Sequence, residues 1–178
     1  MKPVPAIIAS VAVLFPGPAS TQTFAEAARA NLALAVELCL RPGTANQQRV
    51  ANFRAAGFAE QVESSLGDTV HHFSAPADTV KAEFYYGQMP EECTVTSNHV
   101  GVTDASAILD RIVPQLYPGY IRNVVQGPLS STTGRAAICV SYQQPNSPIP
   151  HVIGVTAART ADTCTDDGTS RIYDVTLV

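Results

Sequence analysis

Four cysteines constrain the fold of this 178-residue chain more than any other feature. They are widely spaced, and the sequence contains no Cys-x-x-Cys or Cys-x-x-His pair. Structural zinc sites usually draw their ligands in such close pairs, and thioredoxin-type redox sites use Cys-x-x-Cys. The spacing therefore argues against both kinds of site. It leaves two disulfides or four buried thiols as the alternatives.

The N-terminal segment, residues 1–19, is typical of a cleavable signal peptide. Lys2 supplies a positive charge, and Val4–Phe15 is an uncharged apolar run that is too short to span a ~30 Å hydrocarbon layer. A Pro-Gly-Pro stretch ends the run, and small residues precede a cleavage point after Ala19. We therefore expect a periplasmic or secreted protein with one domain over residues 20–178 and no integral membrane span after cleavage. The alternatives are a buried N-terminal helix and an uncleaved anchor.

Export favours disulfides, because they persist in oxidising compartments. Four cysteines allow three pairings, and the expected side-chain directions favour one of them. Cys39 lies on the apolar face of a helix predicted over residues 23–40, and Cys93 faces inward from a strand. Cys139 alternates away from its apolar neighbours, and Cys164 lies in a polar loop. We expect the disulfides Cys39–Cys93 and Cys139–Cys164.

Hydrophobic periodicity separates helices from strands. Thr23 can cap the first helix, Thr44 a second that continues briefly to Leu66, and Thr103 a third with a clean apolar stripe. Pro114 should kink or end the third helix early. Between and after the helices the period changes to two, which predicts strands over residues 69–74, 80–86, 93–100, 120–126, 136–143, 151–157 and 171–177.

This order of elements predicts the α+β class. Most of the strands are joined by short turns, which suits antiparallel pairing. The helices do not alternate regularly with the strands, which argues against a doubly wound parallel sheet. We expect a single domain with one antiparallel sheet, and with the N-terminal helices and one central helix packed on one face. The order of elements also repeats weakly, as β-β-β-α and then β-β-β-β, which hints at two related halves, although no repeat of residues supports a duplication.

The composition is globular, with 46% hydrophobic and 15% charged residues, and the net charge is −4. No run of basic residues occurs. Nucleic-acid binding depends on clustered Lys and Arg at phosphates, and polybasic membrane patches need similar clusters. We therefore expect neither kind of partner, and instead a protein partner or a partner in the cell envelope.

The histidines do not form a recognisable metal motif. His71 and His72 are adjacent on a strand and point to opposite faces, and His99 and His151 lie on other strands. A site assembled in space from three of them remains an alternative to scattered structural histidines. We favour the scattered arrangement and expect no metal and no cofactor.

Asp162, Asp166 and Asp167 precede Gly168 and could supply oxygen ligands to calcium. Their spacing departs from the EF-hand loop, which alternates its ligands and ends in Glu. An Asp-Gly turn is the favoured interpretation.

Catalytic motifs are also weak. Residues 130–135 resemble a phosphate-binding loop but lack its Gly spacing and its Lys. No Gly-x-Ser-x-Gly elbow occurs, and the adjacent Glu91 and Glu92 are not opposed across a cleft. Exposed tyrosines such as Tyr85 and Tyr117 could bind a peptide, glycan or protein, although sheet packing is favoured. We assign no catalytic residue.

Three segments that follow the signal peptide resemble those of a known class of proteins. These are Glu37-Leu38-Cys39 at the end of an Ala-rich helix, Glu92–Ser97 (ECTVTS) and Ala137–Tyr142 (AICVSY). With the signal peptide, they make the chain similar to small uncharacterised exported proteins of Gram-negative bacteria. The resemblance implies a periplasmic location and implies no activity.

The sequence favours a non-enzymatic exported module that binds a partner or serves in the cell envelope. One alternative is a small periplasmic hydrolase or metal-dependent enzyme whose site is built from distant His, Asp and Ser residues. Another is a secreted inhibitor or accessory subunit. A deep pocket that gathered two or more of His71, His99, His151 and Asp104 would favour the enzyme.

Overall fold

The computed structural model of the protein describes residues 22–65, 67–86, 92–123, 139–148, 151–159 and 164–176. Two helices come first, followed by four strands, a third helix and four more strands. In chain order these are α1 (Phe24–Leu40), α2 (Asn46–Ala55), β1 (Ala59–Ser65), β2 (Asp68–Ser74), β3 (Lys81–Tyr86), β4 (Glu92–Ser97), α3 (Val102–Leu116), β5 (Ile121–Asn123), β6 (Val140–Gln143), β7 (His151–Thr156) and β8 (Ser170–Thr176). No helix in these ranges is long and apolar enough to cross a membrane.

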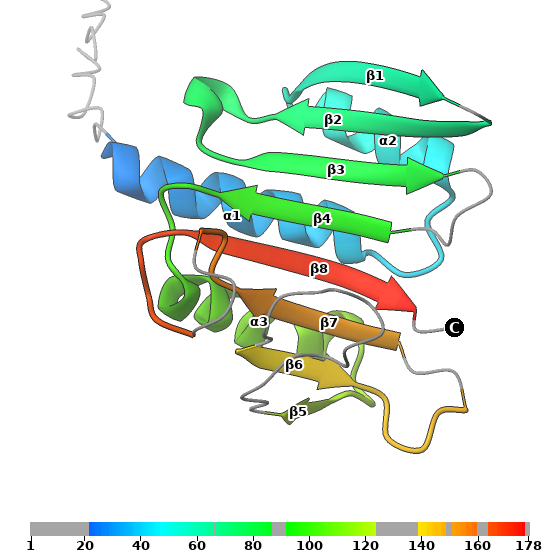
Figure 1. Ribbon diagram of the computed structural model, residues 1–178, viewed down its shortest axis with the longest axis vertical. Helices are drawn as coiled ribbons and strands as arrows, with labels where there is room; N and C mark the ends of the chain where they lie inside the picture. The colour runs from blue at the N-terminus through cyan, green and yellow to red at the C-terminus, as the bar shows by residue number, and fades with distance from the viewer. Residues whose placement is uncertain are drawn as a thin grey trace, which may run out of the picture.

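The eight strands form one antiparallel sheet in the order β1-β2-β3-β4-β8-β7-β6-β5. Each half of the chain folds as a meander, and the last strands of the two halves pair in the middle, with Val95 opposite Ile172. All three helices lie on the same side of the sheet (Figure 1). The predicted α+β class, with helices packed on one face, is confirmed. The hint of two related halves corresponds to two four-strand meanders on either side of α3.

The main core lies between the helices and the sheet. Apolar side chains of α1 and α3 meet the inward residues of the central strands, because alternate strand residues point to the same face. Among the residues that the structure describes, the largest fully buried side chains are Phe53, Phe73, Phe84, Leu32, Leu40, Leu109, Ile153, Ile172, Val36, Val80 and Val95.

The prediction for the first helix is confirmed in its details. Thr23 caps α1, and with Glu26 it forms a capping box in which each side chain bonds the other residue's backbone N–H. The expectation that Pro114 ends the third helix early is wrong, because α3 runs through it to Leu116. Pro114 stands in the last turn, where its missing N–H removes one helical bond and leaves the end of the helix intact. The N–H of Tyr117 still donates to the carbonyl oxygen of Val113 at 2.7 Å.

The second helix differs more from the expectation. It begins at Asn46 and ends at Ala55, and its N-cap residue is Ala45, not the predicted Thr44. The predicted continuation to Leu66 is wrong, because Ala59–Ser65 forms strand β1. This strand pairs with β2 along all seven of its residues. Pairing with a neighbouring strand overrides the weak helical pattern of a polar segment.

Both disulfides join elements that are far apart in the sequence. Cys39–Cys93 links α1 to β4 with a Cα–Cα distance of 5.8 Å, and Cys139–Cys164 links the start of β6 to the loop before β8 at 5.2 Å. These are the pairs that side-chain direction favours in the sequence. The predicted strand segments 124–126 and 136–138 lie outside the described residues.

Candidate functional site

Three polar side chains form a hydrogen-bonded chain beneath one end of the sheet. The hydroxyl of Tyr120 lies 2.6 Å from Nδ1 of His151, and Nε2 of His151 contacts Oδ1 of Asp174. His151 begins β7, and Asp174 lies on the neighbouring strand β8. A carboxylate can only accept hydrogen bonds, so Nε2 donates to Asp174, and in that tautomer Nδ1 accepts from the Tyr120 hydroxyl. This order of hydroxyl, imidazole and carboxylate is that of a catalytic triad.

The turn after α3 supplies the two tyrosines of this site. The N–H of Tyr120 donates to the carbonyl of Tyr117 at 3.0 Å, and the two rings lie 4.8 Å apart. The hydroxyl of Tyr117 donates to the carbonyl oxygen of Leu40, the last residue of α1, at 2.7 Å. Because Leu40 is in the last turn of α1, its carbonyl has no hydrogen-bond partner within the helix. Tyr117 therefore connects the end of α1 to the site and is half-buried, not exposed as the sequence suggested.

Arg49 of α2 borders the same region. Its guanidinium lies over the ring of Phe84, 5.5 Å from the centroid, and its charge lowers the pKa of Tyr117 slightly against larger opposing effects. The Nε atom of Arg49 is buried and has no hydrogen-bond partner among the described residues. The Cys39–Cys93 disulfide lies beside the site as well, because Cys93 is opposite Asp174 in the β4–β8 pair.

Burial and charge hold both tyrosines in the protonated form. Desolvation raises the pKa of Tyr117, and the negative charge of Asp174 raises it further. The same two causes, in the same order, raise the pKa of Tyr120. A tyrosine that acts as a nucleophile or as a general acid near neutral pH needs its pKa lowered. The two hydroxyls are therefore hydrogen-bond donors, and the geometry resembles a triad without its activated oxygen.

The remaining histidines lie elsewhere. His71 faces the helices and its Nδ1 lies 2.6 Å from Glu60, which is also bound by Arg54. His72 points to the opposite face, as predicted, and its Nδ1 lies 3.5 Å from Glu83. His99 is exposed and packs edge-on against Phe24, with ring centroids 5.0 Å apart. The structure does not bring these side chains together with His151.

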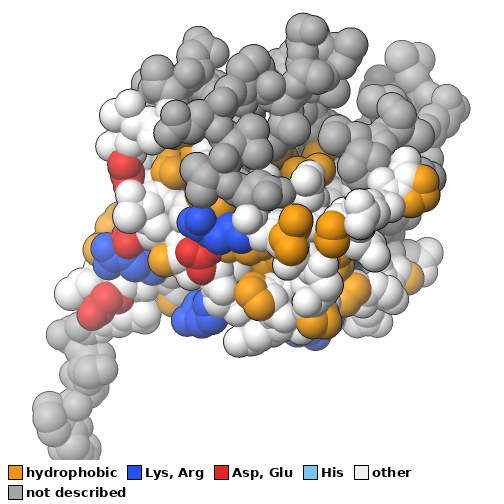
Figure 2. Space-filling view, turned by 90° about the horizontal axis from the view of Figure 1, so that it is seen from below, with side chains coloured by type: hydrophobic (Ala, Val, Ile, Leu, Met, Phe, Trp, Pro, Cys, Tyr) orange, Lys and Arg blue, Asp and Glu red, His pale blue; other side chains and the backbone are white. Residues whose placement is uncertain are grey.

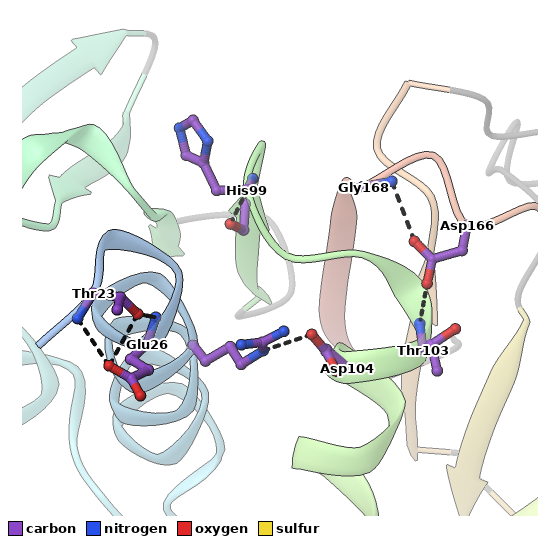
Figure 3. A network of polar contacts seen from close by, with 9 residues as sticks. Thr23, Glu26, His99, Thr103, Asp104, Asp166 and Gly168 are labelled. Atoms are coloured by element: carbon purple, nitrogen blue, oxygen red, sulfur yellow. Dashed lines mark hydrogen bonds and ion pairs between the residues drawn. The ribbon is translucent and has the colours of Figure 1, made fainter.

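Asp166 caps α3 from a loop that is distant in the sequence. Its Oδ2 accepts from the N–H of Thr103 at 3.0 Å, and its Oδ1 accepts from the N–H of Gly168 at 3.2 Å (Figure 3). The cap residue by backbone geometry is Gly101, which has no side chain to offer, so the predicted cap by Thr103 is wrong. Hydrogen bonding with the side chain of Thr103, and then with its backbone N–H, is the main cause that lowers the pKa of Asp166. A candidate calcium ligand thus serves as a helix cap.

Asp167 has a similar local role, because its Oδ1 accepts from both the N–H and the hydroxyl of Thr169, at 2.9 and 2.5 Å. Asp162 lies outside the described residues, as do residues 130–135 and Glu91, and the side chain of Glu92 is not described either. Within the part of the chain that is described, no three His, Cys, Asp or Glu side chains are placed to hold a metal ion.

An open depression of about 300 Å³ lies on the outer surface of the helix layer, between α1 and α3. Arg29 and Asp104 form an ion pair across it, with Nε and Oδ2 2.6 Å apart. None of the histidines lines it. Its lining residues are Arg29, Ala30, Ala33, Asp104, Ala107, Ile108 and Arg111. Viewed from below, acidic and basic side chains intermingle on one side of the molecule, and hydrophobic side chains stand in small groups on the other (Figure 2).

Comparison with protein families, curated proteins and solved structures finds no match to this chain.

Sequence reasoning found part of this site and missed the rest. It singled out His151 and Tyr117 separately, and it did not consider Asp174. One signal was present in the sequence, because Asp174 is a lone carboxylate between apolar residues of a strand, and such groups are rarely buried without a partner. The identity of that partner depends on the pairing of β7 with β8, which the sequence does not state.

Proposed function

We propose that this protein is an exported, disulfide-stabilised module that binds a partner in the cell envelope and does not catalyse a reaction. One observation carries the proposal. The described side chains that could act as general acids or bases pair with other side chains of the protein, and these pairs lie in separate places. Asp104 pairs with Arg29, His71 with Glu60, and His151 with Asp174. A hydrolytic or metal-dependent site would need several of them around one substrate.

The disulfides support the binding role. One fixes α1 to the sheet, and the other fixes the loop that caps α3 to the start of β6. A surface built on elements held in this way loses little conformational entropy when it binds, which favours affinity. The bonded cysteines also support export, with residues 1–19 as the cleaved signal, because disulfides persist in the periplasm and outside the cell.

Export is tested by expressing the full chain in a Gram-negative host and fractionating the cells. We expect the protein in the periplasm or the medium, with an intact mass that corresponds to a chain beginning at Ser20. Alkylation without reduction should leave all four cysteines unmodified. An intact Met1 on a cytoplasmic protein with free thiols would contradict the proposal.

Binding is tested by placing a photo-crosslinking residue at each exposed large apolar position that the structure describes and irradiating intact cells. These positions are Phe24, Leu34, Val62 and Ile121. We expect one reproducible heterologous crosslink from one position, with the other three as matched controls. The absence of any specific crosslink, or the same products from all four positions, would count against a dedicated partner.

The Tyr120–His151–Asp174 order favours a second candidate, a hydrolase in which Nδ1 of His151 acts as general base on a water molecule that takes the place of the Tyr120 hydroxyl. The side chain of His151 is 25% exposed, so a water molecule or substrate can reach it. The purified protein should then hydrolyse one member of a chromogenic ester, phosphoester and peptide panel, and His151→Gln should abolish the activity while His72→Gln, on the opposite face of the sheet, retains it. Absence of turnover in the wild type supports the binding module.

A further inference from the structure

Among the described strands, β1 forms one outer edge of the sheet. It pairs with β2 on one side, in unbroken register from Ala59 opposite Ser74 to Ser65 opposite Asp68, and it is the first strand in the sheet order. None of the other described strands lies along its second side. Within the described residues the opposite edge of the sheet is shorter, because three residues of β5 are described there against seven in β1. A regular seven-residue edge offers a row of backbone N–H and C=O groups to another strand.

The edge of β1 lacks most of the features that prevent pairing. Natural edges are blunted by charged side chains, especially Lys, and by Pro, bulges or charges turned inward. The strand Ala-Glu-Gln-Val-Glu-Ser-Ser contains neither Lys nor Pro, and its charged residues are Glu60 and Glu63. Glu60 is turned beneath the sheet, but there its carboxylate is already paired with Arg54 and with Nδ1 of His71. At the midpoint of the strand stands Val62, whose side chain is 51% exposed. An apolar residue at the centre of such an edge favours burial by a partner strand.

We propose that β1 pairs antiparallel with β1 of a second copy of this chain, with Val62 on the two-fold axis. In that register Val62 faces its own counterpart, Gln61 faces Glu63, and Glu60 faces Ser64. All seven residues of β1 find a partner. The two sheets then become one continuous sheet, and because directly opposed residues of an antiparallel pair share a face, both helix layers lie on the same side. The interface is isologous and closes as a dimer.

Charge selects this register over its neighbours. Moving the axis to Glu63 places two carboxylates directly opposite each other, and moving it to Glu60 does the same. Moving it to Gln61 avoids that repulsion but leaves two residues of each strand unpaired. Like charges directly opposite each other destabilise a strand pair. The register centred on Val62 is therefore the one that uses the whole strand and opposes no like charges.

The first test is sedimentation velocity of the exported protein over the widest concentration range that its solubility allows. We expect a reversible monomer–dimer equilibrium. Val62→Lys places two cations at the axis and should shift the protein to monomer, whereas Ile121→Lys at the β5 edge, where the native side chain is 48% exposed, should leave the dimer intact. Because both sites are exposed, circular dichroism should show unchanged folding. A wild type that is monomeric throughout overturns the proposal.

The register has its own test. In this register, residue 61 of each copy is opposite Glu63 of the other copy, so a substitution at Gln61 acts at two places in the dimer. Gln61→Lys should lower the dimer dissociation constant several-fold, whereas Gln61→Glu should raise it several-fold. Directly opposed Cβ atoms lie about 5 Å apart, so Val62→Cys should form a disulfide between copies under oxidising conditions, and Ile121→Cys should not. Equal effects of the two Gln61 substitutions, or crosslinking at Ile121 and not at Val62, overturn this interface. The proposal does not depend on export or on a heterologous partner, so its failure leaves the proposed function standing.

Discussion

At the scale of single residues, Glu60 shows how neighbours set an ionisation state. Its carboxylate accepts from Nε of Arg54 at 2.5 Å and from Nη2 at 3.0 Å, and it lies 2.6 Å from Nδ1 of His71. The hydrogen bonds from Arg54 are the main cause that lowers its pKa, against some desolvation. Since the pKa is lower in the folded state, Glu60 contributes stability above its unfolded pKa of about 4.3. That contribution is lost as the pH falls through the folded value.

We therefore expect Glu60→Gln to lower the free energy of unfolding by about 1 kcal/mol at neutral pH. The difference from wild type should shrink once the pH is below the unfolded pKa of the carboxyl. Urea denaturation at neutral and acidic pH measures it. Glu63→Gln is the control, because Glu63 is exposed and lies 3.8 Å from His72. An equal loss from Glu60→Gln at both pH values would show that packing, not charge, is responsible.

Tyr142 gives the opposite dependence on pH. Burial, together with the hydrogen bond that its hydroxyl donates to Asp110, raises its pKa to about 12. Because the folded pKa exceeds the unfolded value of about 10, the stability that Tyr142 contributes is complete below pH 10 and is lost as the pH rises toward the folded value. Wild type should lose stability over this window, and Tyr142→Phe should lose less. Denaturation at pH 9 and pH 11 tests it, with Tyr120→Phe for comparison.

At the scale of elements, α3 depends on a loop that is remote in the chain. Asp166 supplies the cap that Gly101 cannot, and the two approach so closely that a Cβ on Gly101 would lie 1.7 Å from Oδ1 of Asp166. Glycine is therefore required here by the close approach of a carboxylate, not by a special backbone conformation. The Cys139–Cys164 disulfide holds the same loop near the start of α3.

Removing this cap should destabilise the protein in a way that depends on both partners. Asp166→Ala should cost about 1 kcal/mol, the usual size of a lost N-cap. Gly101→Ala should cost at least as much, because it displaces the Asp166 side chain. The double variant should lose less than the sum of the two single losses. Gly119→Ala is the matched control, since a Cβ on Gly119 would meet nothing within 4 Å beyond its chain neighbours. Chemical denaturation of the four variants provides the measurement.

At the scale of the whole molecule, two crosslinks connect the helices and loops to one sheet. The Cys39–Cys93 disulfide closes a longer stretch of chain than Cys139–Cys164, with sequence separations of 54 and 25. Closing a longer loop removes more conformational freedom from the unfolded chain. The crosslink between α1 and β4 should therefore be the more stabilising one.

Replacing Cys39 and Cys93 by Ser should reduce the free energy of unfolding by roughly 2–4 kcal/mol, and by about 0.5–1 kcal/mol more than replacing Cys139 and Cys164. Guanidinium denaturation of the two paired variants provides the comparison. The fully reduced wild type should be less stable than either variant. A larger loss from the Cys139 and Cys164 pair would mean that the native contacts of the capping loop outweigh the effect of loop length.

The sequence by itself determined what depends on neighbours along the chain. Thr23 and Glu26 stand three residues apart, so their capping box is a local signal, and the stripe of α3 and the alternation of β3 are local in the same way. The inward direction of Cys39 and Cys93 follows from the same periodicities. These signals were sufficient for the α+β class and for the disulfide pairs that the structure contains.

Only the tertiary structure decided what depends on partners that are remote in the sequence. Ala59–Ser65 has a polar composition that suits a helix as well as a strand, and pairing with β2 makes it a strand. Tyr120, His151 and Asp174 become one hydrogen-bonded chain through the pairing of β7 with β8 and the turn after α3. Hydrogen bonds and packing act over a few ångströms, so they become visible only once the fold has brought these residues together.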